Sequence, residues 1–150
     1  MSDPSDRYGA FIFLRDLSHD RALAAALGDM IVVWAEAERN LIHIAEKVLR
    51  VNYSMVADIF SRVPTFESRI KIVRALVAEW IEPGPSADSL LKLLDRLRVV
   101  FDMRTPKGVR ARRKSVKAHD VANHVTTVRK CSDELPDLLS ALQPRSDLGS

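Results

Sequence analysis

Residues 19–50 read HDRALAAALGDMIVVWAEAERNLIHIAEKVLR, and this stretch decides the fold. Its apolar residues recur at intervals of three and four, which is the spacing of one face of an α-helix. The residues of this stripe are Leu23, Leu27, Met30, Ile31, Trp34, Leu41, Ile44, Ala45 and Val48. The spacing therefore predicts one long amphipathic helix, for which Ser18 is the expected N-cap.

The same spacing repeats in four later segments. They cover about residues 54–62, 65–80, 86–101 and 120–142. Thr65, Ser86 and Asp120 are the expected N-caps of the last three, because their side chains accept from backbone N–H groups in the first turn. Pro136 lacks a backbone N–H and is expected to kink the last helix or divide it near Ser132.

These segments predict an all-α fold, an antiparallel bundle of four to five helices, because short connections make neighbouring helices antiparallel. With 150 residues, 47% of them hydrophobic, the chain fits one domain over residues 1–150, of which residues 1–8 are expected to be disordered. Val109–Lys117 alternates in part like a strand. A small hairpin is therefore the alternative to a loop before the last helix.

Residues 104–117, here called the basic segment, carry seven positive charges and no negative one. The seven residues are Arg104, Lys107, Arg110, Arg112, Arg113, Lys114 and Lys117. Without them the formal net charge of +3 becomes −4. Such a local cluster indicates an anionic partner, and phosphate backbones are the commonest one. The alternative is a solvated charged turn.

Other sequence features exclude several classes of protein. No apolar run approaches the roughly 18 residues that span a bilayer, and residues 1–8 lack the apolar core of a signal peptide. Membrane association is therefore not expected. The single cysteine, Cys131, forms no intramolecular disulfide, which is typical of the reducing cytoplasm. Its place in the last expected helix favours packing over a nucleophilic role.

No cofactor or metal is expected. The four histidines are His19, His43, His119 and His124, and their spacing matches no zinc-binding pattern. His43 lies among apolar neighbours and is expected to be a hydrogen-bonded core or interface residue. The five glycines are scattered, so no phosphate-binding loop is formed, and no serine stands in a nucleophile elbow.

Glu38 is the acidic residue of most interest in the first long helix. It lies four residues after Trp34 and three before Leu41, so it borders the apolar stripe. A partly buried carboxylate there needs a partner such as an arginine. The alternative is an ordinary surface salt bridge with Arg39 or Lys47.

One set of residues follows a fixed order along four of the expected helices. The set is Trp34, Glu38, Leu41, Ala45, Phe60, Arg69, Ile70, Phe101, Asp102, Met103 and Arg104. This order resembles that of the bacterial HEPN superfamily over roughly residues 22–142. The resemblance implies an all-α bundle and a homodimer. Many members of that family are metal-independent ribonucleases of toxin and defence systems.

The catalytic signature of that family is an arginine followed by a polar residue, three variable residues and a histidine. Arg104 and Thr105 match the first two positions, but Gly108–Arg110 occupy the region where the histidine is expected. The resemblance implies that Glu38 and Asp102 orient Arg104. Without the histidine, the group that would activate a ribose 2′-hydroxyl is absent. Arginine alone still binds phosphate through two hydrogen bonds.

Two explanations of the incomplete motif stay open: the motif has degenerated, or the natural chain carries further residues between Arg104 and Thr105. The predicted function is a homodimeric domain of toxin or defence type that binds RNA or another polyanion, with an antitoxin or other protein as a further partner. The first alternative is a non-enzymatic oligomerisation or adaptor bundle. The second is a metal-independent ribonuclease, if residues follow Arg104. The basic segment has no aromatic residue, so its contacts with RNA would be mainly electrostatic.

Overall fold

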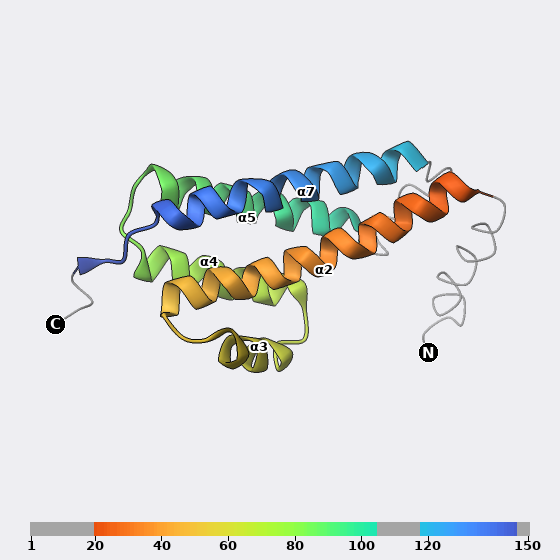
Figure 1. The fold of residues 1–150 in the computed structure, drawn as a ribbon. Helices are drawn as coiled ribbons and strands as arrows, with labels where there is room; N and C mark the ends of the chain where they lie inside the picture. The colour runs from red at the N-terminus through yellow and green to blue at the C-terminus, as the bar shows by residue number, and fades with distance from the viewer. Residues whose placement is uncertain (1–19, 105–117, 147–150) are drawn as a thin grey trace.

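The computed structural model describes residues 20–104 and 118–146, with the side chains of residues 102–104 left out. Within these residues the protein is an all-α bundle, as the sequence predicts (Figure 1). Its helices are α2 (Arg21–Leu49), α3 (Tyr53–Ser61), α4 (Phe66–Trp80), α5 (Pro85–Arg104) and α7 (Ala118–Ala141). The expected disorder of residues 1–8 and the loop or hairpin before the last helix lie outside the described residues.

Helices α2, α4 and α7 run in one direction and α5 runs in the other (Figure 1). The α2–α7 pair is parallel, because Trp34 bonds His124 and Asn40, further along α2, bonds Ser132, further along α7. The antiparallel arrangement holds for α4 with α5 and for α5 with α7. Helix α2 is parallel to α4 because α3 carries the chain back, so that Phe66 begins α4 beside Trp34.

The helix ends follow capping chemistry, although some caps differ from the expected ones. Thr65 caps α4 as predicted, its side chain accepting from the Ser68 backbone. Asp20 caps α2 in place of Ser18. Helix α5 starts one residue before Ser86, since Pro85 already has the backbone angle of a first helical residue. Helix α7 starts at Ala118, which puts Asp120 in its first turn.

The core confirms most of the predicted apolar faces. Ile31 of the first apolar stripe is exposed (70%) where burial is expected, and two apolar residues of the following helices, Ile59 and Trp80, are exposed as well. On α2 the buried face is centred on Val33, Trp34 and Ala37, which turns Ile31 outward. The register of a helix fixes which of several adjacent apolar residues faces inward, and the run Met30–Ala35 did not specify it.

Helix α7 is continuous through Pro136, so the helix is not divided near Ser132, which was one of the two expected effects of this proline. The residues after α7 lie along the α4–α5 connection. The Glu82 backbone donates to the Gln143 carbonyl (2.8 Å), and the Arg145 guanidinium donates to the carbonyls of Ala78 (2.9 Å) and Ile81 (3.2 Å). These contacts satisfy carbonyls at the end of α4 that have no partner within the helix. No helix among the described residues is long and apolar enough to cross a bilayer.

Candidate functional site

Of the predicted site residues, Glu38 lies within α2 and Arg104 at the end of α5, and the others lie wholly or partly outside the described part. Arg104 is the last residue of α5, and the chain re-enters the described structure at Ala118, the first residue of α7. The side chains of Asp102 and Arg104 lie outside the described residues. So do the other basic residues predicted to bind nucleic acid, which are Lys107, Arg110, Arg112, Arg113, Lys114 and Lys117.

An aromatic cluster packs the end of the bundle from which the basic segment departs. The ring of Trp34 meets Phe66 edge-on at 5.2 Å between centroids and Phe101 at 5.6 Å. Phe66 and Phe101 are themselves 4.8 Å apart. The cluster joins α2, α4 and α5 just before α5 ends at Arg104. Aromatic pairs in this geometry contribute packing energy beyond the area they bury.

His124 joins α7 to the same cluster. The indole N–H of Trp34 donates to Nε2 of His124 at 2.9 Å, so this nitrogen is the acceptor of the bond. The sequence analysis missed this role, because it considered His124 only as a metal ligand. The signal was present: His124 is three residues from Val121 and four from Val128, both on the buried face of α7.

Glu38 is half-buried on α2, as its place beside the apolar stripe predicts. The alternative, a surface salt bridge with Arg39 or Lys47, is not formed, since Glu38 makes no ion pair with any described residue. Its role in orienting Arg104 stays a prediction. His43 is hydrogen-bonded as expected, its Nδ1 lying 3.2 Å from a Glu46 carboxylate oxygen, but with its side chain 51% exposed it is not a core residue.

Among residues 20–104 and 118–146, no three histidine, cysteine or acidic side chains come close enough together to hold a metal ion. His119 pairs instead with the adjacent Asp120, at 3.1 Å.

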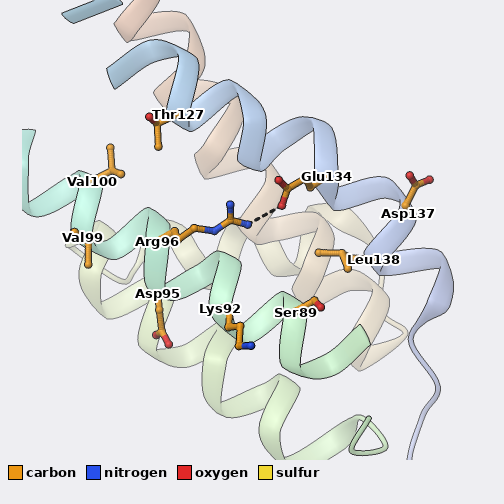
Figure 2. Close-up of a pocket in the computed structure, with 10 residues that line it drawn as sticks. All are labelled: Ser89, Lys92, Asp95, Arg96, Val99, Val100, Thr127, Glu134, Asp137 and Leu138. Atoms are coloured by element: carbon orange, nitrogen blue, oxygen red, sulfur yellow. Dashed lines mark hydrogen bonds and ion pairs between the residues drawn. The ribbon is translucent and has the colours of Figure 1, made fainter. Parts of the chain in front are cut away.

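A groove runs along the outer side of the α5–α7 pair, with a volume of about 900 Å³ (Figure 2). Its walls are the facing turns of the two helices. The lining residues are Ser89, Lys92, Asp95, Arg96, Val99 and Val100 of α5 and Thr127, Glu134, Asp137 and Leu138 of α7. The sequence did not predict this groove. Lys92, Arg96 and Val99 share one face of a helix by their spacing, but such a spacing is also typical of a face that is simply exposed to solvent.

An ion pair bridges the middle of the groove. Arg96 donates to a carboxylate oxygen of Glu134 at 2.6 Å, which Figure 2 shows as the dashed line. This hydrogen bond lowers the pKa of Glu134 and raises that of Arg96. The Glu134 side chain is 37% exposed, so water screens the pair and its contribution to stability is modest.

Cys131 lies one turn before Glu134 on α7 and is 1% exposed, which confirms its predicted packing role. Burial raises the pKa of its thiol, and the nearby charge of Arg96 only partly opposes that rise. A buried thiol with a raised pKa is a poor nucleophile. The groove therefore offers no reactive cysteine.

Comparisons of the chain with family models, with curated proteins and with solved structures found no match.

Proposed function

We propose that this chain is a HEPN-like, homodimeric domain that binds RNA or a similar polyanion through its basic segment, without cleaving it. The proposal extends to a cytoplasmic role of toxin or defence type. The observation that carries it is the concentration of positive charge: seven cations and no acid occupy residues 104–117, while the rest of the chain has a net charge of −4.

The arrangement of the helices supports this function. The basic segment connects α5 to α7, and both helices are held at that end by contacts with Trp34: Phe101 packs on its ring and His124 accepts from its N–H. The two points where the segment leaves and rejoins the bundle are therefore fixed. A cationic segment with anchored ends loses less conformational entropy when it binds a phosphate backbone than a free tail would.

Ion pairs on the helices also support binding through the basic segment. Several cations of the described surface are paired with carboxylates: Arg62 with Asp58, Lys71 and Arg98 with Glu67, Arg74 with Asp95, and Arg96 with Glu134. Paired charges attract polyanions weakly because their fields cancel over short distances. The largest local concentration of positive charge in the sequence is the basic segment.

Binding without cleavage is proposed because the motif that begins at Arg104 has no histidine at the expected spacing. Arg104 would hold a phosphate, but the motif has no histidine that could activate the ribose 2′-hydroxyl. Incubation with labelled RNA, with and without a chelator, tests this part. Intact RNA is expected in both reactions, and cleavage that resists the chelator would contradict it.

The binding itself is tested by removing charge in two places. Arg110→Ala, Arg112→Ala and Arg113→Ala together are expected to weaken binding of single-stranded RNA, measured by fluorescence anisotropy at low salt. The matched control removes three exposed cations elsewhere, with Arg39→Ala, Lys47→Ala and Arg129→Ala. A control that weakens binding as much as the first triple variant would show that net charge alone acts, and the assignment to the basic segment would fail.

The second candidate function is a non-enzymatic oligomerisation or adaptor bundle, which the open α5–α7 groove favours. In that case the protein would form its complexes with protein partners and show no affinity for RNA. The anisotropy measurement above separates the two, because an adaptor would give no binding signal with either the wild type or the variants.

A further inference from the structure

We infer that the first half of α2 carries an interaction surface for the apolar segment that precedes this helix in the same chain, residues 10–17. The surface is formed by Leu27, Gly28, Ile31 and Val32 and is here called the open α2 face. Such a contact lies within one chain and does not depend on RNA binding.

The open α2 face is uncovered because α2 starts before α4 does. Helix α4 begins at Phe66, whose ring meets that of Trp34 at 5.2 Å. The two helices are parallel, so the turns of α2 before Trp34 extend beyond the start of α4 (Figure 1). Leu27 and Ile31 are seven and three residues before Trp34 and therefore lie on the same side of α2. In the described part of the chain, no helix takes the place of α4 beside these turns.

The open α2 face is apolar and exposed to solvent. Ile31 is 70% exposed and Val32 is 60% exposed. Gly28 lies one turn before them, and a Cβ atom at this glycine would meet no other atom within 4 Å. Asp29 is the one charged residue between positions 23 and 35, and it stands on another side of the helix, two residues before Ile31. The face therefore suits an apolar partner.

The residues that lead into α2 supply a segment of matching chemistry. Residues 10–17 read AFIFLRDL and contain five large apolar side chains, two of them phenylalanines. A segment of this composition gains free energy by burying its side chains, whereas segments that stay in solvent contain few aromatic residues. The basic segment joins the bundle at the same end, but its seven positive charges make it a poor occupant of an uncharged face.

The connection to α2 is long enough for the contact. Ile31 lies 11 residues after Asp20, the N-cap of α2, which is about 17 Å along the helix axis. Phe13 lies seven residues before Asp20, and seven extended residues span up to about 23 Å. Residues 10–17 can therefore return along α2 as far as Ile31 and take the place that α4 has further along the helix.

Thiol labelling tests whether residues 10–17 cover the open α2 face. Val32→Cys places a thiol in the face, and Val99→Cys places one on α5, where the native valine is 61% exposed against 60% for Val32. The native Cys131 is 1% exposed and should react too slowly to interfere. Each variant is made in the full chain, with and without Phe11→Asp and Phe13→Asp, and its rate of reaction with a maleimide is measured. Circular dichroism checks that all variants keep their helices.

Coverage by residues 10–17 predicts that the two phenylalanine substitutions raise the labelling rate at position 32 by about tenfold or more, because this thiol loses its cover. The rate at position 99 should not change. An unchanged rate at position 32, or equal increases at both positions, would overturn the inference. A rate at position 32 that falls as the protein concentration rises would assign the face to a second copy and would overturn it as well. RNA binding enters none of these outcomes, so the proposed function is tested separately.

Discussion

Helices α5 and α7 meet in two different ways along their length. Near Phe101 and His124 the rings of Trp34 and Phe66 fill the space between the helices on the inner side of the bundle. Around Arg96 and Glu134 the outer side of the same pair is an open groove crossed by one ion pair. The inner face of the helix pair is therefore packed within the bundle, whereas its outer face is open to solvent and available for contact.

The residues on each face account for this division. The inner face carries large rings and a partly buried hydrogen bond, which contribute energy only in one arrangement. The outer face carries charges and valines, which are stable in water and also suit an interface. Folding should therefore depend on the inner face and association on the outer one.

The largest effect on stability is expected from removing Trp34, the centre of the aromatic cluster. Trp34→Ala should lower the free energy of unfolding by about 3–5 kcal/mol, because it leaves a cavity beneath three helices. Val99→Ala, on the outer face, should change it by no more than about 0.5 kcal/mol, because that side chain is mostly exposed. Urea denaturation followed by circular dichroism measures both. Similar losses for the two variants would remove the distinction between the faces.

A smaller effect is expected from the hydrogen bond that ties α7 to the cluster. His124→Leu leaves the buried Trp34 N–H without this acceptor and should cost about 1–3 kcal/mol. In a Trp34→Phe background, which has no N–H to donate, the same substitution should cost less. A double-mutant cycle in urea gives the coupling. Zero coupling would mean that the bond does not hold the cluster together.

The smallest effect on stability is expected from the Arg96–Glu134 ion pair in the groove. Glu134→Gln should reduce stability by no more than about 1 kcal/mol at neutral pH, because the ion pair is half-exposed. Since Arg96 lowers the pKa of folded Glu134 below that of the unfolded chain, its contribution is complete above the ordinary value of about 4.3 and is lost as the pH falls through the folded pKa. The free energies of unfolding of the wild type and of Glu134→Gln should therefore become equal as the pH falls from neutral to about 3. A difference that persists in acid would contradict the assignment.

The sequence predicted the helices better than it predicted the surfaces between them. Intervals of three and four determined the all-α class and the buried face around Leu41, Ile44 and Leu94, because a helix has to bury one continuous stripe. Local spacing does not encode how helices pair. For this reason the parallel run of α2 and α4, the bond between Trp34 and His124 and the α5–α7 groove could not be derived from it.

The basic segment was visible in the sequence because charge needs no tertiary context to be counted. The roles of Arg104, Asp102 and Glu38 came from a resemblance, and of these Glu38 alone has a described side chain, half-buried as expected. Ile31 shows the limit of pattern reading. In an apolar run longer than one helical turn, the neighbours of the helix decide which residues are buried.

The salt dependence of RNA binding tests directly whether the basic segment binds the phosphates of RNA. If all seven cations of the basic segment neutralise phosphates, the logarithm of the binding constant of single-stranded RNA should fall against the logarithm of the salt concentration with a slope of about −5. Removing Arg110, Arg112 and Arg113 should reduce the slope to about −3, while the control without Arg39, Lys47 and Arg129 keeps it. Equal slopes for the wild type and both triple variants, or no binding at low salt, would contradict the account.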